Sequence, residues 1–264
     1  MGGGIAGLSL LYRLHRSGFD NLLLIDKDSM VSGESGKSAG IVLHNDEGLR
    51  SLEIYRELEV GIKEYPEFSY VNPYEYAIKI YYGLRSEGVV FELFEEVTGF
   101  ETFEGQVLKV ITSRDTYDVE RLFLAANIGN LELLDKLEID VPFKFLKIQE
   151  AIFYSEKPLD MVGTHVDGFY IRTEGTNSLI VLGEPQEVEE HRHGLTRADE
   201  EFVERVVELL LSLGYEELGL RRTLIGYEMV VPRNYRTGTN VYVFSCLNGW
   251  GSTNAPYRAW NLEI

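Results

Sequence analysis

The sequence predicts an α/β fold with a Rossmann-like parallel sheet and an antiparallel sheet interleaved with it. Three observations favour this fold. The chain opens on a Gly-x-Gly-x-x-Gly motif, Gly2 to Gly7, followed by a helical stripe of leucines. Residues 22–25 form an apolar run that ends at Asp26, as a buried parallel strand would. Patterns typical of strands then dominate from residue 97 to residue 182.

The glycine motif predicts a bound dinucleotide. Gly2 would allow a tight turn, Gly4 a close approach to a pyrophosphate, and Gly7 close packing of the helix, whose N-terminus attracts phosphate. Asp26 follows Gly7 by 19 residues, the spacing at which such folds hydrogen-bond a ribose hydroxyl. The strand that delivers the chain into this motif is expected to lie before Met1. A plain glycine loop beside a solvated aspartate is the alternative.

The remaining elements follow in order. We expect a charged helix over residues 46–65, a helix from Asn72-Pro73 to residue 86, and a strand over 89–93. An antiparallel meander is predicted from 97 to 126. A second antiparallel sheet takes residues 143–154, 169–172 and 178–182. A capping box at Thr196 to Asp199 opens a helix that ends at Gly214. Strands over 224–231 and 241–245 and a final helix from about Asn254 complete the chain.

Composition excludes several classes of protein. The formal net charge is −18, so nucleic acid and anionic membranes are not expected partners. No apolar run is long enough to span a membrane, and a single cysteine, Cys246, excludes an internal disulfide. A cytoplasmic location is the expectation. The sequence does not indicate an oligomeric state.

Two further segments combine glycines with hydroxyl groups. Residues 32–40 follow the strand that ends at Asp26, and their backbone could donate to a pyrophosphate. Gly249 to Thr253 forms a turn before the last helix, whose positive N-terminal end could stabilise negative charge on a reduced cofactor ring. Each segment could also serve only as a turn.

The order of these motifs resembles the flavin-dependent D-amino-acid oxidase, glycine oxidase and sarcosine oxidase family. The matching segments include the glycine motif, residues 25–27, 35–40, 71–73, 88–91, 96–97, 124–126, 148–149, 169–172, Gly226 with Pro232, and 248–256. The resemblance implies a Rossmann-like FAD-binding parallel sheet with an interleaved antiparallel substrate-binding sheet. It places the FAD-binding domain in residues 1–45, 73–140 and 223–264. The substrate side is then 46–72 and 141–222.

In that family the flavin takes a hydride from a carbon bearing an amine, and oxygen or another acceptor reoxidises it. The resemblance therefore implies an FAD-dependent oxidoreductase with a small-molecule amine or amino-acid substrate. Its implied cofactor-binding residues are Gly2, Gly4, Ile5, Ala6, Gly7, Asp26, Lys27, Ser35, Lys37, Ser38, Ala39, Gly40, Val97, Asn127, Gly249, Trp250, Gly251, Ser252 and Thr253.

The chain departs from the family pattern at three places. Asn127 stands where the third strand usually ends in glycine, and Glu228 stands where an arginine usually clamps the substrate carboxylate. Between residues 65 and 71 there is little room for the usual strands of the substrate sheet. We expect either an incomplete version of a longer protein or a reduced form. A non-catalytic flavoprotein and an NAD-dependent dehydrogenase are the alternatives.

Tyr170, Arg172 and Glu228 are the candidate catalytic residues. Tyr170 and Arg172 share one face of a predicted strand, and Arg172 could replace the missing carboxylate clamp. An exposed polar face is the alternative. His191 and His193 lie in an acidic loop that is more typical of solvated surface than of a metal site, so no metal is expected. Cys246 could link covalently to a flavin, although a small apolar packing role is favoured.

Overall fold

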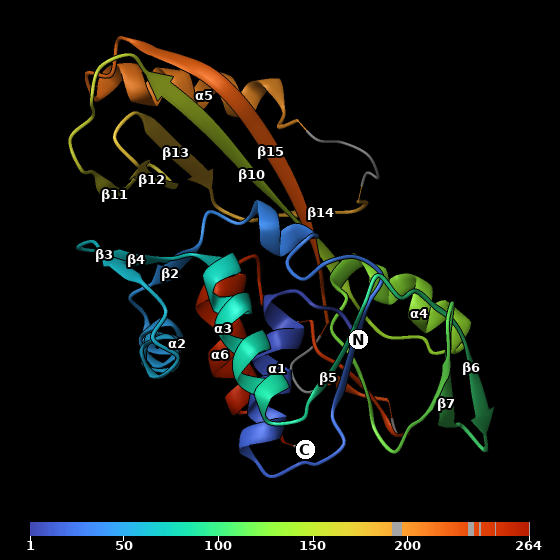
Figure 1. Ribbon diagram of the computed structural model, residues 1–264. Coiled ribbons are helices and arrows are strands. Elements are labelled where there is room, and N and C mark those ends of the chain that lie inside the picture. The colour runs from blue at the N-terminus through green and yellow to red at the C-terminus, as the bar shows by residue number, and fades with distance from the viewer. Residues whose placement is uncertain (192–196, 232–234, 238, 246, 264) are drawn as a thin grey trace.

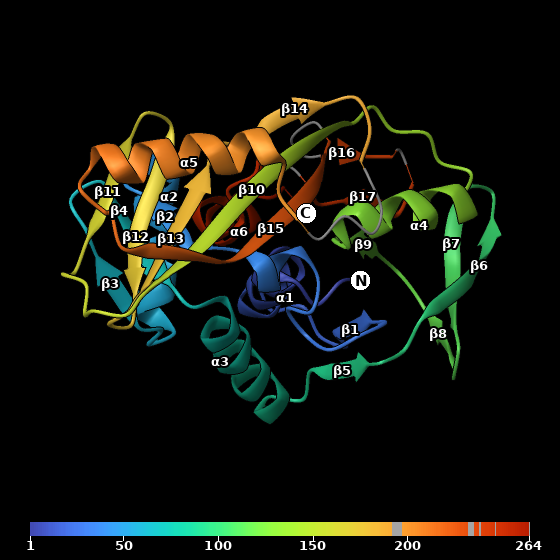
Figure 2. The ribbon, with the colours of Figure 1, turned by 90° about the horizontal axis from the view of Figure 1, so that it is seen from above.

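The computed structural model describes residues 1–191, 197–231, 235–237, 239–245 and 247–263. A long antiparallel sheet lies above a lower body in which helices stand beside short parallel strands (Figure 1). Seen from above, β10 and β15 cross over α6 and α1 (Figure 2). The predicted α/β class, with parallel and antiparallel sheets, is confirmed.

Two short parallel ladders form the part of the lower body that carries the glycine motif. The strand β1 (Leu23–Asp26) pairs with β5 (Val90–Leu93), and β9 (Leu122–Leu124) pairs with β17 (Val241–Val243), which β16 (Tyr235–Arg236) flanks. The first two residues lie between the ladders. The Gly2 N–H donates to the Ile25 carbonyl at 2.9 Å, and the Met1 carbonyl accepts from the Ala125 N–H at 2.9 Å.

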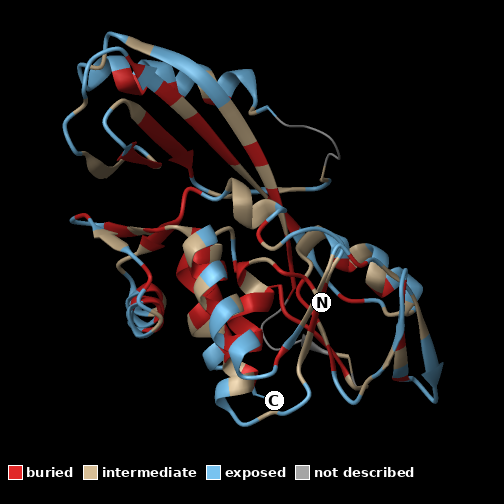
Figure 3. Cartoon of the chain, in the orientation of Figure 1, coloured by how far each residue is buried: buried red, intermediate tan, exposed pale blue. Residues whose placement is uncertain are grey.

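Three helices pack beside these strands, and their facing sides are buried (Figure 3). They are α1 (Ile5–Arg16), α3 (Pro73–Ser86) and α6 (Gly251–Trp260). The predicted bounds of α3 are confirmed, because Asn72 Oδ1 accepts the Tyr74 N–H at 2.9 Å and Pro73 takes the first helical position. The last helix begins three residues earlier than expected.

The predicted helix over 46–65 is wrong in its second half. Helix α2 (Asp46–Glu57) ends early because the chain turns at Leu58 and Glu59, where Glu59 takes a positive φ of 56°. The strands β3 (Ile62–Glu64) and β4 (Phe68–Val71) follow, and β4 also pairs with β2 (Ile41–Leu43). A short turn, η1 (Glu34–Lys37), precedes β2.

The meander consists of β6 (Val97–Phe103), β7 (Gln106–Thr112) and β8 (Thr116–Asp118). The prediction that it continues to residue 126 is wrong, since β9 leaves the meander for its parallel pairing with β17. A turn, η2 (Asn127–Gly129), and helix α4 (Asn130–Lys136) come next.

The upper sheet has six strands, with β10 (Lys144–Ser155) at its centre. The others are β11 (Gly163–Val166), β12 (Phe169–Glu174), β13 (Ser178–Gly183), β14 (Gln186–Val188) and β15 (Leu218–Val230). Sequence reasoning identified β10, β12 and β13 and missed β11 and β14. Because β15 pairs with β10 along its whole length, the domain boundary expected at 222/223 falls inside this strand.

Helix α5 (Glu200–Ser212) covers the outer face of this sheet. Phe202, Val206 and Leu209 of the helix pack on Ala151 and Phe153, so these two residues of β10 face outward. Asp199 is the N-cap, whereas Thr196 of the expected capping box lies outside the described residues. Ile148, Glu150 and Ile152, which alternate with the outward-facing residues of β10, face the lower body.

In the described part of the chain, no helix is both long and apolar enough to cross a membrane.

Candidate functional site

A cavity of about 620 Å³ lies between the lower body and the upper sheet. Its walls come from segments far apart in the sequence: both glycine turns, the loop after β1, the start of β6, the end of β9, and the inner face of β10 and β15. Seventeen sequence-predicted residues line it: Gly2, Gly4, Ile5, Ala6, Asp26, Lys27, Ser35, Lys37, Ser38, Ala39, Val97, Asn127, Glu228, Gly249, Trp250, Gly251 and Ser252.

The glycine motif allows the start of α1 to pack closely against the end of β9. Gly2 has a φ of +98°, and a Cβ there would lie 2.5 Å from the Ala125 carbonyl oxygen. A Cβ on Gly7 would lie 1.8 Å from the Gly2 carbonyl oxygen. Gly7 does not line the cavity. Its missing Cβ allows the close packing that places Gly2 and Gly4 at the cavity wall.

The N-terminus of α1 opens into the cavity without a capping side chain of its own. Ser35 from the neighbouring loop fills this role, because its Oγ accepts the Ile5 N–H at 3.0 Å. Asp26 lies on the other side of the motif and accepts the Gly3 N–H at 2.6 Å. The first turn of α1 and Asp26 thus present N–H donors and a carboxylate side by side.

The loop after β1 brings two charged side chains into the cavity. Lys37 Nζ donates to Glu34 Oε1 at 2.8 Å, while Glu34 Oε2 is buried with no hydrogen-bond partner among the described residues. Ser38 Oγ accepts the Gly40 N–H at 3.2 Å. Gly40 itself has a φ of +67° and packs behind the cavity, against the Val71 carbonyl.

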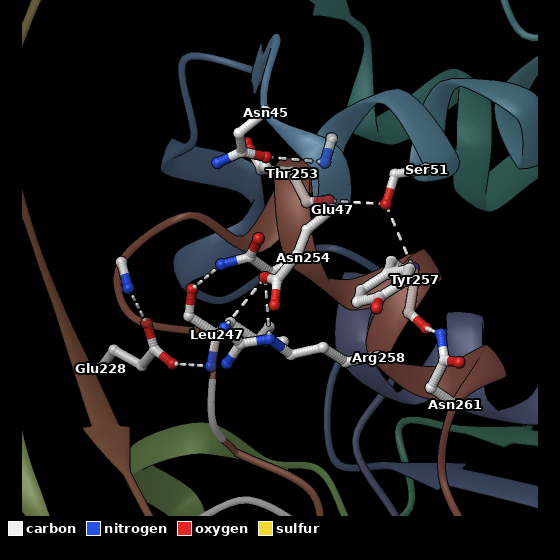
Figure 4. A network of polar contacts seen from close by, with 12 residues as sticks. Asn45, Glu47, Ser51, Glu228, Leu247, Thr253, Asn254, Tyr257, Arg258 and Asn261 are labelled. Carbon is white, nitrogen blue, oxygen red and sulfur yellow. Dashed lines mark hydrogen bonds and ion pairs between the residues drawn. The ribbon is translucent and has the colours of Figure 1, made fainter.

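Glu228 accepts hydrogen bonds from the C-terminal turn (Figure 4). Its carboxylate takes the Leu247 N–H at 2.7 Å and the Gly249 N–H. Burial raises the pKa of Glu228 to about 7, and these N–H groups act in the opposite direction. The carboxylate therefore fixes the turn that ends at Trp250.

Thr253 does not line the cavity. It is fully buried, and its hydroxyl accepts the Leu43 N–H at 3.0 Å and donates to the Ile41 carbonyl at 3.2 Å. Its carbonyl accepts the Ser51 hydroxyl at 2.6 Å (Figure 4). Thr253 thus ties the start of α6 to β2 and α2.

Asn127 retains the backbone conformation that a glycine would take there. Its φ is +54°, which asparagine tolerates better than most residues. Its side chain donates to the Tyr227 carbonyl at 2.7 Å and accepts the Met229 N–H at 2.9 Å. The amide therefore joins η2, which follows β9, to β15 at the wall of the cavity.

Tyr170 and Arg172 do not line the cavity, although they share the face of the sheet that looks toward the lower body. Tyr170 packs against Phe68 and lies edge-on to Trp250, with ring centroids 5.0 Å apart. Arg172 is 3% exposed, donates to the Ala39 carbonyl at 3.1 Å, and pairs with Glu174. Its guanidinium lies 3.9 Å from the Tyr70 ring centroid.

Sequence reasoning missed Glu150, which lines the cavity from the middle of β10. The side chain is 5% exposed, and burial raises the pKa of Glu150 to about 7 although Arg172 and Arg222 lower it. A carboxylate between Ile148 and Ile152, on the apolar face of this strand, was the available signal.

No group of three metal-binding side chains occurs among the described residues. His191 lines the cavity and packs against Phe145, with ring centroids 4.8 Å apart. His193, Pro232 and Cys246, which the sequence analysis singled out, lie outside the described residues.

Comparison with known proteins agrees with this geometry. A family model described as FAD dependent oxidoreductase (DAO) matches residues 46–261. The FAD-dependent monooxygenase penM of Penicillium crustosum is 31% identical over 135 residues, which are 50% of this chain and 27% of that protein. The match thus spans about a quarter of the length of that curated relative.

Two solved structures share the fold across nearly the whole chain. Glycine oxidase from Bacillus cereus has a TM-score of 0.73 at 16% identity, covering 99% of this chain and 92% of that one. L-amino acid deaminase from Proteus vulgaris has a TM-score of 0.74 at 12% identity, covering 98% and 90%. The family match covers most of the chain and the fold agrees with it, so the protein belongs to the DAO family of FAD-dependent oxidoreductases.

Proposed function

We propose that this protein binds FAD in the cavity and oxidises a small amine or amino acid. The observation that carries the proposal is the convergence of the Gly2–Gly7 motif, the Ser35 loop and the Gly249–Ser252 turn on one cavity beneath the upper sheet. In an NAD-dependent dehydrogenase, the C-terminal turn would have no evident role.

The residues present fit FAD. The N-terminus of α1 offers backbone donors to the pyrophosphate, and a Cβ on Gly4 would meet only the Ser35 side chain, so the backbone there is open to a ligand. Asp26 would accept a hydrogen bond from a ribose hydroxyl, as its distance along the chain from the glycine motif indicates. Ser252 Oγ lines the cavity and is buried without a described hydrogen-bond partner, as expected of a cofactor contact.

When bound, FAD supplies the acceptor for the two electrons that leave the substrate carbon. The chain's own residues would position the reactants. The positive end of α6 at Gly251 and Ser252 faces the cavity, where it stabilises negative charge. Ile148, Leu182 and Trp250 provide an apolar wall that excludes water from the substrate side.

Flavin absorbance tests the proposal. Protein purified in excess FAD should retain flavin after gel filtration, and an oxidisable amine added under anaerobic conditions should bleach its absorbance. Air would then restore the absorbance if oxygen is the acceptor. Failure to hold FAD, even after refolding in its presence, would overturn the proposal.

A non-catalytic flavoprotein is the second candidate, and Glu228 favours it. The carboxylate stands where the resemblance leads us to expect an arginine, and it engages the N–H groups of the C-terminal turn. Retained FAD that no amine or amino acid in a broad panel bleaches would support this candidate over the first.

A further inference from the structure

Glu150 and Glu34 are the two cavity-lining carboxylates that have a buried oxygen without a hydrogen-bond partner among the described residues. Asp26 and Glu228 accept backbone N–H groups. The other oxygen of Glu34 pairs with Lys37, whereas Glu150 forms no ion pair among the described residues. Glu150 Oε2 is buried and has no hydrogen-bond partner among the described residues. A buried carboxylate without a partner is costly, so its presence at the wall of a ligand cavity calls for a partner of opposite charge.

The surroundings of Glu150 are apolar. Leu182 on β13 and Leu224 on β15 lie directly opposite it, and Ile148 lies two residues along β10 on the same face. All three line the cavity. A ligand beside Glu150 would therefore meet its carboxylate among apolar side chains, while the carboxylate of Glu34, which pairs with Lys37, lies against Gly226 on β15.

The nearby cations are engaged elsewhere or point to solvent. Arg172 donates to the Ala39 carbonyl and pairs with Glu174 outside the cavity. Arg222 lies opposite Ile152, two positions along β15 from Leu224, and is exposed. Lys37 pairs with Glu34. Beside Glu150, the described lining therefore offers no cation for a substrate carboxylate.

We propose that Glu150 binds the ammonium group of the substrate, and that the substrate is an amine with an apolar substituent and no carboxylate. The proposal rests on the function proposed above and narrows its substrate class. The ammonium neutralises the buried carboxylate, while Ile148, Leu182 and Leu224 contact the substituent.

Three small probes of similar shape test it: tert-butylamine, tert-butanol and 2-aminoisobutyrate. None carries a hydrogen on the substituted carbon, so none can be oxidised and binding is measured without chemistry. Calorimetric titration of the FAD-loaded protein at pH 8 should give tert-butylamine an affinity about tenfold or more above both others.

Substitutions at Glu150 supply the controls. Glu150→Gln should reduce tert-butylamine affinity by about tenfold or more and leave tert-butanol within about twofold. Glu150→Asp should retain part of the preference. Glu187→Gln, an exposed carboxylate on β14 that pairs with Lys144, should leave all three affinities unchanged.

Two results would overturn the proposal while leaving FAD-dependent oxidation intact. One is FAD-loaded protein that binds 2-aminoisobutyrate as tightly as tert-butylamine. The other is unchanged tert-butylamine affinity in Glu150→Gln. If the protein does not hold FAD, the proposed oxidation fails instead, and the same titrations on FAD-free protein still decide the role of Glu150.

Discussion

At the scale of single residues, the polar groups at the cavity wall differ in whether they have hydrogen-bond partners within the protein. Glu228 and Asn127 are held by backbone groups of neighbouring elements and so act as braces. Glu150 Oε2 has no hydrogen-bond partner among the described residues. The sequence predicted that Tyr170 and Arg172 share one face of the sheet, since alternate residues of a strand point to the same side. Their burial was not, because Phe68 and Tyr70 come from a distant strand.

Glu150 should make stability depend on pH. Its pKa is about 7 in the folded protein against an ordinary 4.5, so between these values the folded state holds a proton that the unfolded chain releases. Stability then falls as pH rises from 4.5 through 7, by on the order of 2 to 3 kcal/mol. FAD-free Glu150→Gln should be more stable than the parent protein by about that amount at pH 8 and similar to it at pH 4.5.

Urea unfolding at the two pH values measures this difference. Glu187→Gln, in the same sheet but 64% exposed, should change stability by less than about 0.5 kcal/mol at either pH. An equal gain at pH 4.5 and pH 8 in Glu150→Gln would show that ionisation of this carboxylate is not the cause.

At the scale of elements, local signals set the beginnings of helices better than their ends. Asn72 and Pro73 specify the start of α3, and the structure follows them. The expected helix over 46–65 fails because Glu59 adopts a positive φ, a conformation for which the sequence pattern gives no warning. The glycine motif is the strongest local signal, because Gly7 lies so close to the Gly2 carbonyl that no residue with a Cβ would fit there.

Gly7→Ala should therefore impair both folding and cofactor binding. Its Cβ would meet the Gly2 carbonyl at 1.8 Å, so α1 must shift away from the motif. We expect a loss of about 2 kcal/mol or more in stability and about tenfold or more in FAD affinity, measured by urea unfolding and flavin titration.

Gly83→Ala is the matched control, because Gly83 is also helical and its Cβ would meet nothing within 4 Å. This variant should gain about 0.5 to 1 kcal/mol and bind FAD as the parent does. Equal behaviour of the two variants would contradict the role assigned to Gly7.

At the scale of the whole molecule, the cavity joins segments from both ends of the chain. Residues of the segment from Met1 to Ala6, the loop after β1 and the turn before α6 meet there. A ligand that contacts all of them stabilises their arrangement in the folded state and has nothing equivalent to bind in the unfolded chain. FAD at about 100 times its dissociation constant should therefore add about 2.7 kcal/mol to the free energy of unfolding.

Thermal unfolding with and without FAD measures this effect as a shift in Tm. The shift should grow with FAD concentration and be much smaller in Gly7→Ala, whose glycine turn is displaced. A Tm that does not respond to FAD would mean that the cofactor does not bind this folded state.

The sequence by itself determined the α/β class, the glycine motif with Asp26, the caps of α3 and the resemblance to the flavoprotein family. The glycine motif and the caps depend on residues close together in the chain, and the fold class and the resemblance depend on the order of such local patterns along it. The tertiary structure alone decided that β9 pairs with β17 and that Arg172 bonds to Ala39 and Glu174. It also decided that Glu150 Oε2, at the cavity wall, has no hydrogen-bond partner in the part of the chain that the structure describes. The physical reason is that these features depend on contacts between distant segments, and only the packed chain determines which polar groups find partners.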